Sequence, residues 1–325
     1  MKSTVSFESV LKDEIESFLE LRKSQGHVMR ADKYMLYTLD RYLREQGRND
    51  KCLPPDIVEG WLLSLPIEMN INTKIVYISH YAQFAKFLRL RGYMAFIPER
   101  PIDDRHYVPY VFTGDELDRL VDAADNAFAT TNKSGKHGCA CFSIILRILI
   151  GCGMRLNEVL LLNTSHVDLI NGIISVKSAK GNKDRLVPMH DSLTNILKLY
   201  INSGIPQTDG LLFPSRNNKA FSQVWARHRF NLALLAAGIE KPVLEKYERN
   251  ICIHCLRHTF AVASFRKLNL EGRDMYEEAP VLSTYMGHER IYGTEKYLHM
   301  TTENSADILA YMEKFNEGLF PEVDL

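Results

Sequence analysis

Residues 151–160 carry an arginine in a position that suits an anion. Arg155 follows a Gly-Cys-Gly-Met run and opens a helical pattern, so its guanidinium would lie beside the partly positive end of a helix. A guanidinium there can hold a phosphate oxygen bidentately. Glu158 lies three residues further on the same face and can orient the arginine. By itself, an Arg-x-x-Glu pair on a helix is more often a surface ion pair.

Two later segments add further donors and a nucleophile. His254 and Arg257 are spaced three apart, which places both on one face of a helix. No acidic residue is close to them in the sequence, so the pair suits an anion better than a carbonyl group or a metal ion. His288 follows a glycine, and Tyr297 comes nine residues after it. Each segment alone is weak evidence, and only the ordered set indicates a site.

In this order the segments resemble the tyrosine recombinase/integrase family. Its pattern is an arginine in a Gly-x-Arg-x-x-Glu context, a lysine in a β-turn, His-x-x-Arg, Gly-His, and a tyrosine shortly afterwards. The matching positions, with Glu158 as the accompanying acid, are Arg155, Lys180, His254, Arg257, His288 and Tyr297. The resemblance covers residues 113–325, and the first hundred residues resemble the family's core-binding domain.

The resemblance implies a DNA strand transfer that needs neither metal nor ATP. Tyr297 would attack a phosphodiester to give a 3′-phosphotyrosine and a free 5′-hydroxyl, and Lys180 would protonate the leaving oxygen. The arginines and histidines would supply fixed donors where charge develops on the phosphate, each worth roughly a few kcal/mol. Because the arginines carry the positive charge, we expect no metal ion and no cofactor.

Some assignments have rivals nearby. Lys177 and Lys183 share the turn with Lys180, but the family's Gly-Lys-Gly-x-Lys-x-Arg pattern, which begins here with Ala179, favours Lys180. Lys183 and Arg185 would then contact the DNA backbone or be surface charges.

Two tyrosines and four possible zinc ligands are also close to the predicted site. Tyr285 and Tyr292 are out of register, and we expect them to be packing residues. The possible zinc ligands are Cys252, His254, Cys255 and His258. On one helix the first two would point to different faces, and no second ligand pair follows to complete four ligands. We therefore expect unpaired thiols there.

The predicted fold is mainly α-helical with a small β-sheet. We expect a helical, SAM-like core-binding domain that binds DNA over residues 1–100, a linker over 101–112, and a mixed α/β catalytic domain with a C-terminal tail helix over 113–325. Apolar residues recur at helical spacing over residues 7–19 and 35–43 in the first domain.

Local signals place several elements of the catalytic domain. Residues 113–116 read Thr-Gly-Asp-Glu, the form of a helix capping box. Strand-like runs at 172–176 and 186–189 flank a turn-rich stretch. The polar segment 129–138 and the segment 269–280 are predicted to be loops.

Charge is balanced overall but unevenly distributed. There are 40 basic and 40 acidic residues, which argues against a simple basic coat for nucleic acid. Residues 69–98 and 210–239 contain no acid, and such basic patches suit DNA, although solvated helix faces are the alternative. The predicted DNA contacts of the first patch are Lys74, Lys86, Arg89 and Arg91. The aromatic residues between them, expected in the core, are Tyr77, Tyr81, Phe84 and Phe87.

The indicated partner is double-stranded DNA that carries a specific recombination site. By resemblance the enzyme would act as a homotetramer on DNA, in integration, excision or transposition of a mobile element. An amphipathic tail over 306–315 would dock on a neighbouring protomer or cap its own domain. The alternatives are a DNA-relaxing enzyme like type IB topoisomerases and a catalytically silent DNA-binding accessory protein.

The expected location is the cytoplasm of a bacterial cell, in association with the nucleoid. The chain starts without the pattern of a signal peptide. Its most apolar stretch, residues 142–154, is interrupted by Arg147 and is shorter than the roughly 20 residues that span a bilayer, so no membrane partner is expected.

Overall fold

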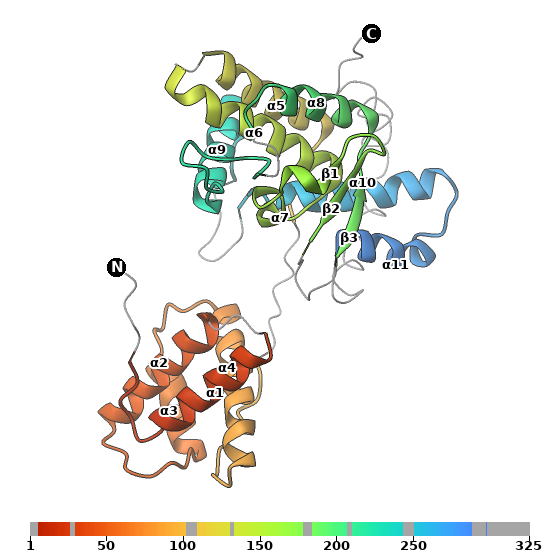
Figure 1. Cartoon of the computed structure of the whole chain (residues 1–325). Coiled ribbons are helices and arrows are strands. Elements are labelled where there is room, and N and C mark those ends of the chain that lie inside the picture. Colours follow the sequence, from red (N-terminus) through yellow and green to blue (C-terminus); the bar gives the residue numbers. More distant parts are fainter. Residues whose placement is uncertain are drawn as a thin grey trace. The chain divides into compact units, whose positions relative to one another are not determined.

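The chain divides into two compact units, Met1–His106 and Tyr107–Leu325 (Figure 1). The division falls inside the segment predicted as the linker. The computed structural model describes residues 6–26, 30–101, 109–130, 133–177, 184–206, 210–242, 250–287 and 297.

The first unit is a bundle of helices with an aromatic core. The bounds of α1 to α4 are Lys12–Ser24, Arg30–Glu45, Pro55–Ser64 and Ile71–Leu90. Tyr77, Tyr81 and Phe84 of α4 are buried, and Phe87 is partly buried against them, so the prediction that these aromatic residues pack in the core is confirmed. Asp40 accepts hydrogen bonds from the Glu8 and Ser9 N–H groups and ties the segment before α1 to α2.

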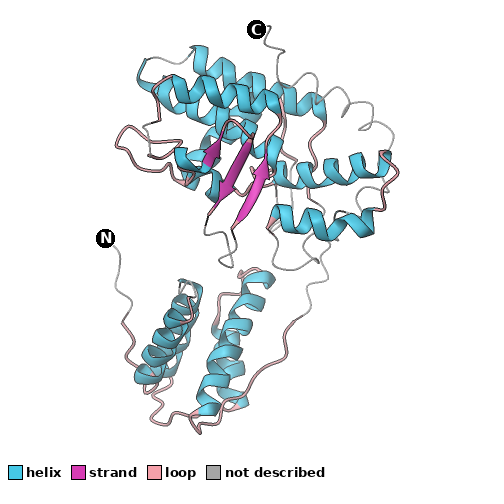
Figure 2. Cartoon of the chain, turned by 45° about the vertical axis from the view of Figure 1, so that its right-hand side comes forward, coloured by secondary structure: helices cyan, strands magenta, loops and turns pink. Residues whose placement is uncertain are grey.

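The second unit is mainly helical with a small antiparallel sheet (Figure 2), as predicted. The helix bounds are α5 Gly114–Thr130, α6 Lys133–Cys152, α7 Leu156–Leu160, α8 Asp191–Asn202, α9 Gln223–Ala236, α10 Cys255–Leu270 and α11 Met275–Met286. The 3-10 helix η1, Thr164–His166, leads into strands β1 Val167–Asp168, β2 Ile173–Val176 and β3 Arg185–Pro188. The strand order is β1-β2-β3, and Ile174 pairs with Val187 across β2 and β3. Strand β1 was not predicted.

Helix α6 is the central helix of this unit. It packs against α5, α8 and α10. Its window Gly135–Cys152 is long and apolar enough to cross a membrane, but 61% of that window is buried inside the protein. Arg147 interrupts the apolar run, and its charge is compensated by the Asp125 carboxylate, with Nη2 and Oδ2 2.7 Å apart. These features identify α6 as a core helix.

The capping box predicted at the start of α5 is confirmed. The Glu116 N–H donates to Thr113 Oγ1 at 3.3 Å, and the Thr113 N–H donates to Glu116 Oε2 at 2.8 Å. Two N–H groups that the helix itself cannot satisfy thereby gain partners.

The prediction of a loop over residues 129–138 was wrong. Helix α5 extends to Thr130, and α6 begins at Lys133. The first turns of α6 gain tertiary contacts: His137 Nε2 lies 2.6 Å from the Pro214 carbonyl, and Gly138 lies against the Trp225 ring. Local polarity therefore gave the wrong result because contacts to distant residues hold these turns.

The prediction of a loop over residues 269–280 was also wrong. Helix α10 runs to Leu270, and α11 begins after the N-cap Asp274 and continues through Pro280. Proline removes one backbone hydrogen bond from a helix interior. Leu282 and Met286, which belong to α11 like Pro280, are buried against α10. The burial of these two side chains offsets the lost hydrogen bond.

The connection from α6 to α7 depends on Gly153. Its φ of +57° lies in the left-handed region, and a Cβ placed there would lie 2.3 Å from Cδ1 of the Phe260 ring. Glycine meets both constraints because it has no Cβ. Arg155, two residues later, is the N-cap of α7, with φ −73° and ψ 140°.

We predict that Gly153→Ala lowers the free energy of unfolding by about 3 kcal/mol, from left-handed strain of about 1–2 kcal/mol and overpacking against Phe260. Gly204→Ala is the matched control, since Gly204 has φ +74° and nothing within 4 Å of an added Cβ. Its cost should be about 1–2 kcal/mol, from strain alone. Urea unfolding of both variants measures the difference, and equal costs would contradict a role for the Phe260 contact.

Candidate functional site

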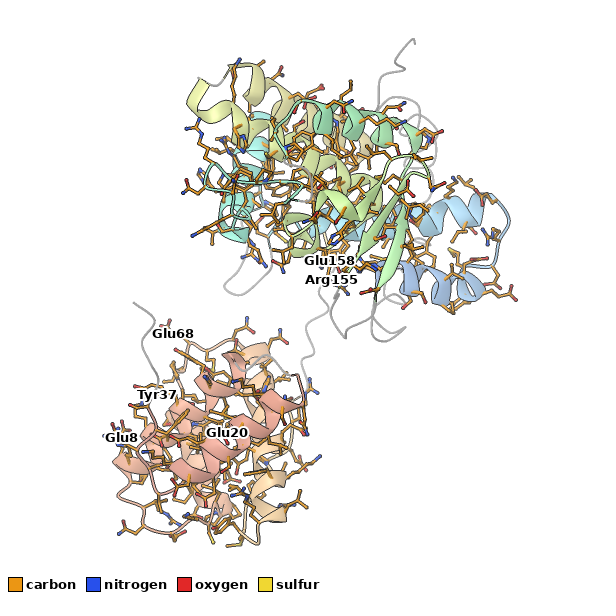
Figure 3. All side chains as sticks on the ribbon, viewed as in Figure 1. Glu8, Glu20, Tyr37, Glu68, Arg155 and Glu158 are labelled. Carbon is orange, nitrogen blue, oxygen red and sulfur yellow. The ribbon has the colours of Figure 1, made fainter. Side chains whose placement is uncertain are left out.

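The carboxylate of Glu158 lies between two guanidinium groups. Arg155 donates to it from Nη1 and from its backbone N–H, each at 2.9 Å, and Figure 3 labels both residues beside α7. Arg185, at the start of β3, donates from Nη1 and Nη2 to the two carboxylate oxygens at 3.0 and 2.7 Å. The Arg185 and Glu158 side chains are only 8% and 10% exposed. One buried negative group is therefore shared by two positive ones.

This environment keeps Glu158 ionised. Burial by itself raises the pKa of the carboxyl group, because it penalises the charged form. The hydrogen bonds from Arg185 and Arg155 outweigh burial and lower the pKa of Glu158 to about 2. The Glu158 carboxylate is thus charged at neutral pH.

The C-terminal end of α11 accepts hydrogen bonds from three arginines. The pairs are Arg185 Nε with the Tyr285 carbonyl at 2.8 Å, Arg257 Nη2 with the Met286 carbonyl at 2.5 Å, and Arg155 Nη2 with the Gly287 carbonyl. The last carbonyls of a helix have no partner within the helix and carry partial negative charge, so cations stabilise this end. Three segments far apart in the sequence meet here.

Gly287 ends α11 in the left-handed conformation, with φ 66° and ψ 43°. A Cβ placed on Gly287 would lie 3.0 Å from Nη1 of Arg185 and 3.2 Å from Nη1 of Arg155. Only glycine combines this backbone with room for two guanidinium groups. The glycine of the predicted Gly-His motif is therefore required by the arginines beside it.

Arg257 is 2% exposed, and its Nη1 donates to the Gly153 carbonyl at 2.7 Å. Burial lowers the pKa of Arg257 to about 10, and the charge of Arg155 acts in the same direction, whereas Glu158 and Tyr297 raise it. Arg257 stays cationic at neutral pH. Its guanidinium is within electrostatic range of Arg155 and Tyr297.

Tyr297 meets a histidine of α10. Its Oη lies 2.6 Å from Nδ1 of His258, and the two side chains are 1% and 4% exposed. The ring also packs among the apolar residues that join α10 to α11, including Val262 and Phe265. Tyr297 thus contacts His258, the neighbour of Arg257 in α10, from within an apolar cluster.

His254 is the N-cap of α10, and its side chain is exposed. The centroid of its ring lies 4.8 Å from that of His258. His254 therefore lies at the N-terminus of the helix that carries the buried Arg257 and His258.

Sequence reasoning missed His258 as a site residue and predicted Arg185 as a DNA contact or surface charge. Strand alternation could have indicated that Arg185 shares the inward face of β3 with the buried Val187. Helical spacing could have placed His258 on the buried stripe that continues at Ala261 and Phe265. Each pattern indicated a buried side chain but did not indicate which residue that side chain contacts.

The predicted residues Lys180, Lys183 and His288 lie outside the described residues, as does Tyr292. Of the competing lysines, Lys177 is exposed, and its Nζ lies 3.2 Å from Oδ2 of Asp184.

Tyr285, predicted as a packing residue, stacks on Phe260 with ring centroids 5.5 Å apart and donates to the Cys152 carbonyl at 3.3 Å. Within the described part of the chain, no three potential metal ligands gather in one place.

The predicted DNA contacts of the first unit lie along α4 and at its end. Lys86, Arg89 and Arg91 are exposed, and Lys74 is half-exposed. Arg89 Nε donates to the Ala95 carbonyl at 2.7 Å, and the Arg91 guanidinium lies over the Phe87 ring. These contacts restrict the conformations of the Arg89 and Arg91 side chains.

Comparison with known proteins gives a consistent match. Residues 110–304 match the model of the phage integrase family. The protein y4rE of Sinorhizobium fredii, described as an integrase/recombinase, is 26% identical over 318 residues that cover 94% of this chain and 95% of the relative. A tyrosine recombinase of Thermosipho africanus is 27% identical over 238 residues, covering 71% of this chain and 72% of the relative.

Solved structures share the fold. The XerH site-specific recombinase bound to a palindromic difH substrate has a TM-score of 0.65 at 19% identity, over 87% of this chain and 79% of that chain. The Tn1549 transposon integrase in complex with circular-intermediate DNA has a TM-score of 0.61 at 18% identity, over 93% of this chain and 99% of that chain.

We predict that Glu158→Gln lowers the free energy of unfolding at pH 7 by about 3 kcal/mol, because it removes one partner of a buried ion pair. The folded-state pKa of Glu158 is depressed, so its contribution is present above the unfolded pKa, about 4.3, and is lost as pH falls toward about 2. The stability difference between wild type and variant should therefore shrink over that range.

Glu271→Gln is the control for this measurement, since Glu271 forms a long, exposed pair with Lys267. It should change stability by no more than about 0.5 kcal/mol. Urea unfolding at several pH values tests both variants. A Glu158→Gln difference that stays constant down to acid pH would contradict the pKa argument.

Proposed function

The chain belongs to the phage integrase family and is therefore a tyrosine recombinase, and we propose that it cleaves and rejoins DNA at a specific recombination site through Tyr297. The observation that carries the proposal is that Arg155 and Arg257 converge on the end of α11, while the Tyr297 hydroxyl contacts His258, the neighbour of Arg257 in α10. Positive donors next to a hydroxyl nucleophile suit an attack on a phosphodiester, which repels free nucleophiles.

Arg155 and Arg257 bind the scissile phosphate in this proposal. A guanidinium has five N–H donors, so hydrogen bonds to carbonyls leave others for an anion. Glu158 and Arg185 act as positioning residues, since their contacts fix Arg155 and the end of α11. His254, exposed at the start of α10, adds a donor from the solvent side.

Tyr297 attacks phosphorus while its proton passes to Nδ1 of His258, 2.6 Å away. The bond from phosphorus to the 5′-oxygen breaks, and Lys180 supplies the proton for the leaving 5′-hydroxyl. His288 adds a donor to the phosphate. The resulting 3′-phosphotyrosine conserves the bond energy, so a second strand can be joined without ATP. Because the Tyr297 hydroxyl is buried, DNA binding has to open a path to it.

The wider assembly follows from the same proposal. Residues 1–100 act as a core-binding domain and 113–325 as the catalytic domain, joined by the linker 101–112. Exposed basic side chains of α4, together with Lys183 from the segment between β2 and β3, contact the DNA backbone. A homotetramer forms on DNA through the C-terminal tail, near the nucleoid of a bacterial cell. The task is integration, excision or transposition of a mobile element.

We predict that wild type forms a covalent adduct on a nicked duplex that carries its site, and that Tyr297→Phe forms none, because phenylalanine has no nucleophilic oxygen. DNA captured covalently in cells and then sequenced supplies the duplex. Tyr276→Phe, an exposed tyrosine of α11, is the control and should form the adduct as wild type does. Denaturing gels measure the adduct, and an adduct with Tyr297→Phe would overturn the proposal.

We predict that His258→Ala slows adduct formation by about 100-fold, the usual scale of proton transfer by a side chain, while DNA affinity stays unchanged. His258→Asn keeps a hydrogen-bond acceptor but cannot take up a proton, so it should also be slow. His228→Ala, an exposed histidine of α9, is the control. Single-turnover cleavage measures the rates, and a fast His258→Asn variant would reduce His258 to a positioning residue.

A further inference from the structure

Two cysteines at the start of α10 have no part in the proposed reaction. Cys252 and Cys255 have their Sγ atoms 3.8 Å apart. Cys252 is exposed and Cys255 is buried. The pair therefore combines one thiol that solutes can reach with a second thiol directly behind it.

The local backbone holds the two thiols together. The Cys255 N–H donates to the Cys252 carbonyl at 2.8 Å, and the Cys252 N–H donates to Cys255 Sγ at 3.4 Å. The spacing of three residues across a helix start brings both side chains to one side. A disulfide needs the sulfur atoms about 2 Å apart, so small side-chain rotations from this contact are enough.

Cys252 is also the reactive member. A hydrogen bond from the Cys255 thiol lowers the pKa of Cys252 to about 6 against the opposing effect of burial, and the His254 N–H and the Arg227 charge help. The thiolate is the nucleophile in thiol chemistry. By contrast, burial raises the pKa of Cys141 to about 11 and that of Cys152 to about 12.

We propose that Cys252 and Cys255 form a reversible disulfide by exchange with a low-molecular-weight disulfide. The Cys252 thiolate attacks one sulfur of the reagent, forms a mixed disulfide and releases one thiolate, which takes up a proton. Cys255 then loses its proton and attacks the Cys252 sulfur, which releases the second thiol. The protein dithiol is oxidised and the reagent disulfide is reduced to two thiols, so electrons and protons balance.

The disulfide also affects the reaction of the proposed recombinase, and this consequence rests on that function. The ring that it closes contains His254, whose carbonyl accepts the Arg257 N–H at 3.1 Å. Closing the ring constrains the backbone on both sides of His254 and thereby changes how its side chain can approach the phosphate. Misplacing one catalytic group slows cleavage by about tenfold or more.

The first experiment treats the full-length protein with oxidised glutathione and maps the product by mass spectrometry of non-reduced peptides. The expected product links Cys252 to Cys255 and reverts with dithiothreitol. Cys252→Ser and Cys255→Ser should each lack it, whereas Cys52→Ser, a control in the first unit, should form it. A stable glutathione adduct on Cys252 without the link to Cys255, or no modification, would overturn the proposal. No DNA is needed, so this result is independent of the proposed function.

A second measurement tests the chemistry of the pair. Iodoacetamide should label Cys252 of the reduced protein rapidly at pH 7, and Cys255→Ala should slow this labelling by about tenfold because it removes the hydrogen-bond donor. The oxidised protein should cleave DNA about tenfold more slowly, with recovery after reduction. Equal labelling in the variant would overturn the role of Cys255, and unchanged cleavage after oxidation would overturn the effect on His254.

Discussion

The carboxylate of Glu158 is the interaction on which the rest of the site depends. It accepts hydrogen bonds from Arg155 and Arg185, which come from different elements of the second unit. Without this negative charge the buried guanidinium of Arg185 and the partly buried one of Arg155 would face each other, and their repulsion would oppose the packing of β3 against α7. A buried ion pair of this kind need not add stability over an apolar contact. The ion pair does fix the positions of the two guanidinium groups, and a site that binds phosphate requires fixed positive charges.

The end of α11 gives the arginines a second common partner. Its free carbonyls carry partial negative charge, so the helix terminus orients the guanidinium groups without neutralising them fully. Arg257 therefore remains cationic although it is buried. The site keeps excess positive charge, which favours a phosphodiester over neutral ligands. Gly287 makes the arrangement possible because any side chain there would displace Arg155 and Arg185.

Neighbouring residues in the first turn of α10 contact different parts of the site. Arg257 faces α11, and His258 faces Tyr297, so the phosphate-binding and nucleophile sides of the reaction share one rigid element. Cys255, at the start of the same turn, contacts Cys252. A covalent change at the helix start is therefore transmitted directly to the groups that would hold the phosphate, since no flexible segment separates them.

The sequence by itself determined the family and the fold class, and it predicted Arg155, Arg257 and Tyr297 at the site, because the motifs and helical spacings are local. It also determined the Thr113–Glu116 capping box, which involves neighbours in one turn. Only the tertiary structure decided which groups meet. Arg185 reaches Glu158 from 27 residues away, and His258 reaches Tyr297 across 39 residues. Such partners are set by packing of the whole core, which also extended helices into segments whose local composition favoured loops.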